Sequence, residues 1–210
     1  MDGVVVDSED YWVDVEADHI FPAVVESEVS PEETTGMNYR EIYGYLDREY
    51  GTTVDEAEFV TTYDEAAEEI YGERVALMDG FRDLVADLRD EGTDVALVSS
   101  SPHHWIDVVL DRFDLSFDAV VSAEDIDAPG KPEPGIYEHA ADVLGHPPAK
   151  CVAVEDSEHG AAAATSAGAY CVGYRHGAAE LDLSAADAVV SNAEELREEL
   201  FTRPGPSASR

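Results

Sequence analysis

The sequence predicts an α/β protein built on a doubly wound parallel sheet. From about Gly80 onward, short β-branched apolar runs alternate with amphipathic stretches of helical length, the pattern of consecutive βαβ units. The runs are continuously apolar, as in strands that are buried on both faces. Glycines such as Gly145 and Gly168 close several amphipathic stretches, where they serve as helix stops. In such a fold, helices cover both faces and ligands lie beyond the carboxyl ends of the strands.

The individual elements follow in chain order. The predicted strands are Val95–Val98, Ala119–Val121, Cys151–Val154, Tyr170–Val172 and Ala188–Val190. The helices predicted between and beside them are Phe81–Asp90, His103–Arg112, Ile136–Leu144, His159–Ala167 and Ala193–Leu200. Each strand is short and each helix is of ordinary length, as βαβ units require.

The stretch before Leu77 has a different pattern. Helical periodicity covers Tyr11–Val29, Tyr39–Tyr50 and Asp55–Tyr71, with breaks at Pro31 and Gly36 and no convincing strand. This pattern predicts a helical domain at 9–77, inserted into a core domain of 1–8 and 78–201. The remaining 202–210 are rich in Pro, Gly and Ser and are expected to form a disordered tail.

The composition excludes several classes of partner. Of 210 residues, 48 are Asp or Glu and only 12 are Lys or Arg, which gives a formal net charge of −36. Such a surface repels nucleic-acid backbones and anionic membranes, so we expect neither as a partner. No apolar run approaches the roughly 18 residues of a membrane helix, and the N-terminus is acidic, so a cytoplasmic location is expected. The oligomeric state stays open between a monomer and a small homo-oligomer.

The carboxylates are spread along the whole chain, which makes the charge a property of the entire surface. Self-repulsion of this size destabilises a compact state unless salt screens it, and the Debye length falls to about 3 Å at 1 M. We therefore expect a salt-rich cytoplasm and a halophilic source. The alternative is an acidic mesophilic protein that is stable in dilute buffer.

Polar residues follow two of the predicted strands. Ser99-Ser100-Ser101 comes after the first strand, and Glu155-Asp156-Ser157 comes after the third. Adjacent carboxylates at a strand end need a cation or hydrogen-bond donors, and hard oxygen ligands suit Mg²⁺ and phosphate-bearing substrates. Gly130-Lys131-Pro132 adds one of only two lysines in the chain. The alternatives are a solvated or helix-capping carboxylate pair and a surface lysine.

Four segments in order resemble the motifs of the haloacid dehalogenase superfamily, in its phosphatase and phosphoglucomutase-like branch with a helical cap. The segments are Met1-Asp2-Gly3-Val4-Val5-Val6-Asp7-Ser8-Glu9, Leu97-Val98-Ser99-Ser100-Ser101-Pro102, Gly130-Lys131-Pro132-Glu133-Pro134 and Val154-Glu155-Asp156-Ser157 with Gly160 and Ala167-Gly168. The resemblance runs nearly end to end. It implies a Rossmann-like core with an inserted α-helical cap, consistent with the periodicity.

The resemblance also implies a mechanism, in which a carboxylate attacks phosphorus and the resulting aspartyl-phosphate is hydrolysed. Asp2 takes the place of the general acid/base, and its main-chain carbonyl would bind Mg²⁺. Ser99 and the backbone N–H of Ser100 would hold the phosphoryl oxygens, and Lys131 would balance their charge. The remaining metal ligands would be Glu155 and Asp156.

The chain departs from the family pattern at the nucleophile. The pattern puts that Asp two residues before Asp2, upstream of Met1, together with a first core strand that lies between the strands ending at Ser99 and Glu155. The first core strand is therefore expected to be truncated here, and the true start to lie upstream. In a less damaging variant, Val4–Val6 would fill the gap as a makeshift strand.

The predicted cap governs the choice among related activities. In the resemblance, phosphoglucomutase-like members carry a His at the position of Trp12 and an Arg at the position of Tyr39, which counts against mutase activity. Trp12 and Trp105 are expected to pack in the cap and core, while Arg40 is a candidate for contact with an anionic substrate. The predicted function is Mg²⁺-dependent hydrolysis of a small phosphorylated metabolite of the sugar phosphate or phosphoglycolate type. The alternatives are a phosphate-binding pseudoenzyme without the nucleophile and a phosphoglucomutase-like phosphotransferase.

Overall fold

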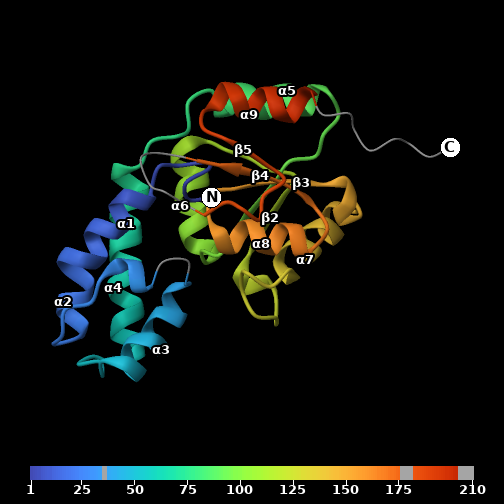
Figure 1. Ribbon diagram of the computed structural model, residues 1–210. Helices are drawn as coiled ribbons and strands as arrows, with labels where there is room; N and C mark the ends of the chain where they lie inside the picture. The colour runs from blue at the N-terminus through green and yellow to red at the C-terminus, as the bar shows by residue number, and fades with distance from the viewer. Residues whose placement is uncertain (35–36, 176–181, 203–210) are drawn as a thin grey trace. The chain divides into compact units, whose positions relative to one another are not determined.

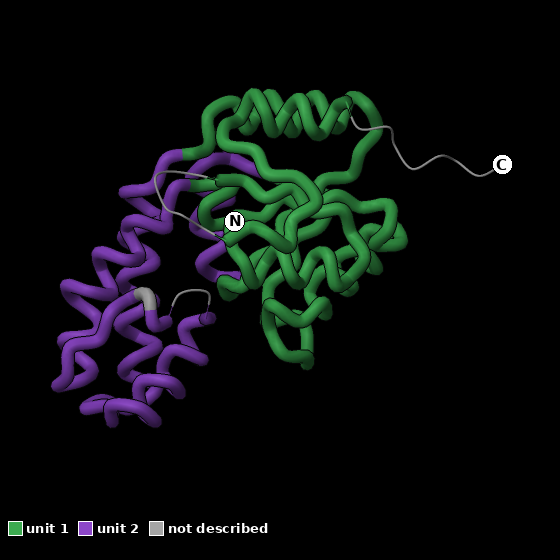
Figure 2. Tube along the Cα trace, viewed as in Figure 1, with its two compact units in different colours: residues 1–6, 77–102, 116–210 green, residues 7–76, 103–115 purple. Residues whose placement is uncertain are grey.

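A computed structural model describes residues 1–34, 37–175 and 182–202. These residues form two compact units, which Figure 2 draws in different colours. Unit 1 comprises residues 1–6, 77–102 and the chain from 116 onward, and unit 2 comprises residues 7–76 and 103–115. The predicted tail at 202–210 lies outside the described residues, apart from Thr202, which is the last residue of a helix.

The described residues of unit 1 form five parallel strands in two groups. Strand β1 (Ala96–Ser99) pairs with β2 (Ala119–Ser122), with Ala96 opposite Ala119 and Ser99 opposite Ser122. Strand β4 (Tyr170–Tyr174) lies between β3 (Val152–Glu155) and β5 (Ala188–Val190) and pairs with both in parallel. All five strands lie within two residues of their predicted bounds, because their short apolar runs are flanked by polar or glycine-containing turns.

Helices cover both faces of these strands, as a doubly wound fold requires. Figure 1 shows α5 (Phe81–Asp90) and α9 (Ala193–Thr202) on one face and α7 (Gly135–Leu144) and α8 (Glu158–Ser166) on the other. Arg197 of α9 donates a hydrogen bond to Asp87 of α5, which ties the first pair of helices together. The sequence prediction of an α/β fold with a parallel sheet and helices is therefore confirmed.

Among the described residues, no strand joins β1 to β3, so the pairing stops between the strands that end at Ser99 and Glu155. This is the position at which the resemblance expects a first core strand. The alternative of a makeshift strand at Val4–Val6 is wrong, because the chain turns there and the N–H of Val5 donates to the Met1 carbonyl at 2.7 Å. Only isolated bridges form, one of which joins Val6 to Leu77.

In the described residues of unit 2, every regular element is helical. It contains α1 (Glu9–Val15), a π-helical turn at Glu16–Ile20, α2 (Phe21–Val24), a 3-10 turn at Pro31–Glu33, α3 (Tyr39–Glu49), α4 (Glu56–Glu69), a second π-helical turn at Ile70–Arg74, and α6 (His103–Phe113). Asn38 and Asp55 accept backbone N–H bonds at the N-termini of α3 and α4, which explains why these helices begin where they do.

The first predicted helix, Tyr11–Val29, ends earlier than its periodicity indicates. Helical backbone stops at Val24, and Val25 is extended. The Val24 carbonyl at this end accepts both the backbone N–H of Thr53, at 2.8 Å, and its hydroxyl, at 3.1 Å. A residue far along the chain thus satisfies the last carbonyl, a contact that local periodicity does not contain.

Helix α6 packs with the other helices of unit 2, although it lies between β1 and β2 in sequence. The Arg112 guanidinium donates to the carbonyls of Tyr71, at 2.7 Å, and Glu73, at 3.1 Å. The indole of Trp105 donates to Asp64 of α4 at 2.8 Å. No helix among the described residues is both long and apolar enough to cross a membrane.

Candidate active site

The site is built at the carboxyl ends of β1 and β3. Ser99 is the last residue of β1 and is buried, and its hydroxyl oxygen accepts the backbone N–H of Ser101 at 3.1 Å. The Ser101 hydroxyl in turn donates to an Asp2 carboxylate oxygen at 3.3 Å. The turn after β1 therefore connects the predicted phosphoryl-binding serine to the predicted acid/base, with Ser100 between them in the chain.

Lys131 forms a buried ion pair with Glu155, the last residue of β3. The ammonium nitrogen lies 2.5 Å from Glu155 Oε1, and only 12% and 6% of the two side chains are exposed. Burial alone would raise the pKa of Glu155, but the charge of Lys131 and the hydrogen bonds to Glu155 outweigh it and lower that pKa. Glu155 is therefore an anion, and its ion pair holds the Lys131 ammonium in place at the end of β3.

Tyr137 donates a second hydrogen bond to the same oxygen, Glu155 Oε1. Burial, and then the Glu155 charge, raise the pKa of Tyr137 well above its usual value, so the phenol stays protonated and acts as a donor. On the other carboxylate oxygen, Ser157 Oγ lies 3.4 Å from Oε2. Three side chains thus surround this one carboxylate.

Asp156 is the next residue after Glu155, and its pKa is shifted in the opposite direction. Burial, and next the neighbouring Glu155 charge, raise the pKa of Asp156 to about 7, and Asp2 adds to the repulsion. The N-terminal ammonium and, less strongly, Lys131 act in the opposite direction, but the pKa of Asp156 remains raised. Asp156 therefore lies buried beside two further carboxylates, Glu155 and Asp2, an arrangement that favours a bound cation.

Two glycines let the backbone approach these carboxylates. A Cβ added to Gly160 would lie 1.9 Å from Glu155 Oε2, and one added to Gly3 would lie 1.8 Å from Asp156 Oδ2. Gly3 also has a φ of +62°, a conformation that other residues rarely adopt. Both glycines belong to the segments that resemble the family motifs, and their absence of a side chain accommodates the acidic pair.

The donor set fits Mg²⁺ in its charge and chemistry. Mg²⁺ is held through one or two carboxylates and retains several waters, so Asp156 with Asp2 would supply the protein oxygens. Across the described part of the chain, no three His, Cys, Asp or Glu side chains form a ready-made metal group. Glu155, predicted as a third ligand, instead has its Oε1 engaged by Lys131 and Tyr137.

The structure therefore brings together most of the predicted site residues within unit 1. Asp2, Ser99, Lys131, Glu155 and Asp156 are linked by hydrogen bonds, an ion pair or charge interactions. Tyr137, Ser101 and Ser157 were not anticipated in these roles. Ser101 and Ser157 carried a signal, because each stands beside a motif residue, whereas Tyr137 reaches Glu155 from a helix 18 residues away in sequence.

Arg40 lies in unit 2 at the start of α3. It pairs with Glu56 at 3.6 Å, its side chain is 53% exposed, and its guanidinium lies over the Tyr39 ring. This ion pair is a weak surface contact. Contact between Arg40 and a substrate stays a prediction.

Trp12 is part of an aromatic cluster in unit 2. It stacks on Tyr63 and Trp105 with ring centroids 5.6 and 5.4 Å apart, and its indole N–H donates to the Tyr71 hydroxyl at 3.0 Å. The packing prediction for Trp12 and Trp105 is confirmed, since the two indoles stack on one another and Trp12 stacks on Tyr63 as well.

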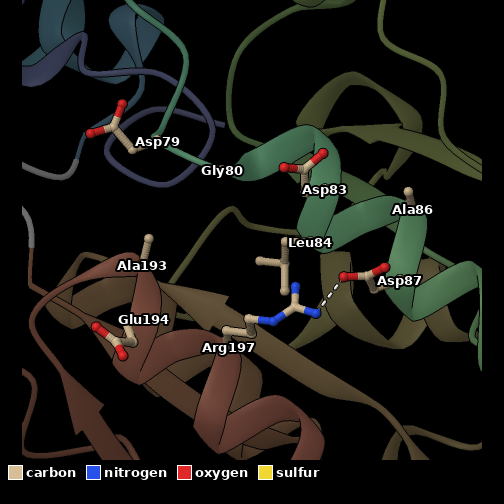
Figure 3. Close-up of a pocket in the computed structure, with 9 residues that line it drawn as sticks. All are labelled: Asp79, Gly80, Asp83, Leu84, Ala86, Asp87, Ala193, Glu194 and Arg197. Atoms are coloured by element: carbon tan, nitrogen blue, oxygen red, sulfur yellow. Dashed lines mark hydrogen bonds and ion pairs between the residues drawn. The ribbon is translucent and has the colours of Figure 1, made fainter.

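A separate hollow lies between α5 and α9, away from these residues. Figure 3 shows that Asp79, Asp83, Asp87 and Glu194 line it together with Arg197, and that Arg197 is bonded to Asp87. Four carboxylates and a neutralised arginine do not suit an anionic ligand. None of the predicted site residues contributes to it.

Comparison with known proteins agrees with this architecture. The model of a hydrolase family described as haloacid dehalogenase-like matches residues 1–168. The chain belongs to this family of haloacid dehalogenase-like hydrolases.

Among relatives, hexitol phosphatase B of Escherichia coli K12 is 34% identical over 172 residues, covering 80% of this chain and 77% of the relative. A beta-phosphoglucomutase of Bacillus subtilis is 36% identical over 127 residues, covering 60% and 54% of the two chains. Among solved structures, CbbY from Rhodobacter sphaeroides in complex with phosphate has a TM-score of 0.78 at 23% identity, with 93% of each chain covered. A putative beta-phosphoglucomutase from Thermotoga maritima has a TM-score of 0.74 at 26% identity, with 97% of each chain covered.

Proposed function

We propose that this protein hydrolyses phosphate monoesters of small metabolites, of the sugar phosphate, hexitol phosphate or phosphoglycolate type. The observation that carries the proposal is the charge arrangement at the ends of β1 and β3, where a pinned Lys131 stands beside Asp156 and Asp2. A fixed cation, a pair of neighbouring carboxylates that can hold a metal ion and a turn rich in hydroxyl groups are what a transferring phosphoryl group requires. Similarity to hexitol phosphatase B supports a polyol or sugar phosphate.

Each residue has a distinct task in this reaction. Ser99 and the backbone N–H of Ser100 bind phosphoryl oxygens, and Lys131 offsets their negative charge. As an attacking carboxylate forms a bond to phosphorus, the bond between phosphorus and the ester oxygen breaks, and Asp2 donates its proton to that oxygen so that the alcohol leaves. Asp2 then takes a proton from water, whose oxygen attacks the phosphorus of the aspartyl-phosphate, so that the bond between the carboxylate and phosphorus breaks and inorganic phosphate is released.

The attacking carboxylate is proposed to come from a residue upstream of Met1, two positions before Asp2. Two observations support this assignment. The described strands leave β1 and β3 without a shared partner, where a further strand would end beside Ser99 and Glu155. The side chains that would handle the proton and the charge are otherwise all present in unit 1.

Mg²⁺ is proposed as the cofactor, held by Asp156 and Asp2, while the neighbouring Glu155 pairs with Lys131. When bound, it supplies positive charge to the phosphoryl oxygens. The raised pKa of Asp156 supports a cation here, since a bound cation would stabilise its ionised form.

Two alternatives differ from hydrolysis. A phosphoglucomutase-like transfer is disfavoured because the Trp12 indole is packed among rings and bonded to Tyr71, leaving no ionisable group at that position. A phosphate-binding pseudoenzyme would use the same serines and lysine without an attacking carboxylate. The experiment below separates it from a phosphatase.

The proposed setting is a salt-rich cytoplasm. The net charge of −36 and the spread of carboxylates along the chain support it, because such a surface is stabilised by screening.

The test is release of inorganic phosphate from an aryl phosphate and from a hexitol phosphate, in molar KCl, with and without Mg²⁺. The chain from Met1 is compared with one extended upstream through the coding sequence before Met1. We expect Mg²⁺-dependent turnover in the extended chain alone. In that chain, Asp156→Asn should lower turnover and weaken the Mg²⁺ dependence by at least about tenfold. Substitutions around a protein metal site typically cost that much in metal affinity or activity.

The matched control is Asp142→Asn, which removes an exposed carboxylate from α7 and should leave turnover unchanged. Phosphate binding without turnover in both lengths of chain would favour the pseudoenzyme. Turnover at the same rate with and without Mg²⁺ would refute Mg²⁺ as the cofactor.

A further inference from the structure

Tyr137 lies where the two groups of strands meet the same helix. It projects from α7 and packs against two hydrophobic clusters of unit 1, one containing Val121 and Ile136 and the other containing Ala153 and Cys171. The first cluster belongs to the β1 and β2 side and the second to the β3 and β4 side. The aromatic ring therefore has an evident packing role between two halves of the sheet that do not pair with one another.

The hydroxyl of Tyr137 has no part in that packing. It donates to Glu155 Oε1, the oxygen that also accepts from the Lys131 ammonium at 2.5 Å. The Lys131 nitrogen stands 5.4 Å from the centre of the Tyr137 ring, so lysine and phenol converge on one carboxylate oxygen from adjacent directions. A cation near an aromatic face gains further attraction from the ring.

The remaining oxygen of Glu155 is confined as well. Oε2 lies against Gly160, where no side chain could fit, and within 3.4 Å of the Ser157 hydroxyl. The carboxylate is thereby held in one orientation, with both donors on Oε1. Without the Tyr137 hydroxyl, Lys131 alone would hold that oxygen, and the carboxylate could rotate with the lysine.

We propose that Tyr137 is a positioning residue, whose hydroxyl fixes the Glu155 carboxylate and through it aims the Lys131 ammonium at a bound phosphoryl group. This inference rests on the proposed function for the identity of that group. Buried acceptors need their full set of donors, and an ion pair holds its geometry only when its remaining lone pairs are satisfied. A purely structural Tyr137 would need its ring alone.

The test compares Tyr137→Phe, which keeps the ring, with Tyr170→Phe as a matched control. Tyr170 also donates its hydroxyl to a glutamate, Glu199 at 2.9 Å, in the same unit. The readout is the rate at which an acylating reagent modifies Lys131, measured by peptide mass spectrometry in molar KCl. Lys150, the second lysine of the chain, is exposed and serves as an internal reference.

In Tyr137→Phe we expect the ratio of Lys131 to Lys150 modification to rise several-fold, and in Tyr170→Phe we expect it to stay at the parent value. An unchanged ratio in a folded Tyr137→Phe protein would overturn the proposal and leave Tyr137 a packing residue. This readout requires neither turnover nor metal.

Calorimetric titration with inorganic phosphate gives the functional arm. Tyr137→Phe should weaken phosphate binding several-fold relative to the parent and to Tyr170→Phe, while equal affinities would contradict the aiming role. If the parent binds no phosphate, the proposed function fails at this site, and the lysine ratio still decides whether Tyr137 positions Lys131.

A second variant covers the case in which Tyr137→Phe does not fold. In Tyr137→Phe/Lys131→Met/Glu155→Gln neither buried charge remains, so loss of the hydroxyl leaves no ion pair short of a donor. Recovery of folding in this triple variant would support the proposal. A triple variant that also fails to fold would overturn it, because the effect of Tyr137 would then not act through the Lys131–Glu155 pair.

Discussion

Glu16 is a carboxylate placed against the aromatic cluster of unit 2. Its Oε1 accepts the Tyr63 hydroxyl at 2.9 Å, and it begins the π-helical turn at Glu16–Ile20. Burial raises the pKa of Glu16 to about 7, and the hydrogen bond from Tyr63 only partly offsets that rise. In the unfolded chain the same group titrates near 4.5.

This difference makes Glu16 a source of pH-dependent instability. Between the two pKa values the folded state binds more protons than the unfolded state, so the contribution of Glu16 to stability falls as pH rises through this window. Glu16→Gln should therefore raise the free energy of unfolding at pH 8 by about 1–3 kcal/mol and change it little near pH 5. Urea unfolding at pH 5 to 8 in constant salt measures the difference.

The control for this pH effect is Glu26→Gln, which alters an exposed carboxylate beyond α2. Its effect should be small and nearly constant over the same range. A Glu16→Gln protein that is no more stable than the parent at pH 8 would mean that Glu16 is ionised at no cost in the fold.

At the scale of elements, the packing of α8 on β3 depends on one missing side chain. Gly160 lies in the first turn of α8, and the Glu155 carboxylate occupies the space where its Cβ would stand. Glu155 is held by Lys131 and Tyr137, so it has little freedom to move aside. The helix approaches the strand end this closely only because residue 160 is glycine.

Gly160→Ala should consequently destabilise the protein by about 1–3 kcal/mol, the usual cost of overpacking. Gly44→Ala is the opposite case, because Gly44 lies exposed within α3 and nothing stands within 4 Å of an added Cβ. It should stabilise by about 0.5–1 kcal/mol through helix propensity. Unfolding midpoints that shift in the same direction for both substitutions would contradict this account.

Elements also mark the limit of sequence-based prediction. Strands and most helices follow from local periodicity and turn residues, and the five predicted strands are present. The first helix ends at Val24, earlier than its periodicity predicts, because Thr53, which is distant in the sequence, donates to the Val24 carbonyl. Likewise, periodicity identifies α6 as a helix but contains nothing about Arg112 reaching the carbonyls of Tyr71 and Glu73.

For the whole molecule, the dominant property is its charge of −36. Screening should raise stability as KCl increases, steeply while the Debye length shortens from about 10 Å at 0.1 M to about 3 Å at 1 M. Each gain of about 1 kcal/mol should raise Tm by about 2–4 °C for a chain of this size. Thermal unfolding in a KCl series measures the effect.

A parallel series in potassium sulfate at matched ionic strength separates screening from surface exclusion. Screening predicts similar curves in the two salts below about 1 M, whereas exclusion predicts a larger effect of sulfate. A Tm that is highest in dilute buffer would refute the salt-rich setting and favour an ordinary acidic protein.

The candidate site was predictable from sequence to the extent that its residues follow strands. Parallel strands bring their carboxyl ends to one edge, which places Ser99 near Glu155 and Asp156 without further information. The role of Tyr137 could not be predicted, because its hydroxyl bonds to a residue from another βα unit. From sequence alone, a single tyrosine in an amphipathic helix is interpreted as a core residue. Sequence also does not show which of the two adjacent carboxylates pairs with Lys131. The structure pairs Lys131 with Glu155, which leaves Asp156 as the proposed metal ligand.

The membership of α6 in unit 2 bears on how relatives of this protein could exchange parts. The chain passes between the two units four times, after residues 6, 76, 102 and 115. A helical module transplanted as residues 7–76 alone would leave Trp12 without its stacking partner Trp105, and would leave the Tyr71 carbonyl without Arg112. Recombination that preserves folding must therefore move two separate stretches of gene together, residues 7–76 and 103–115.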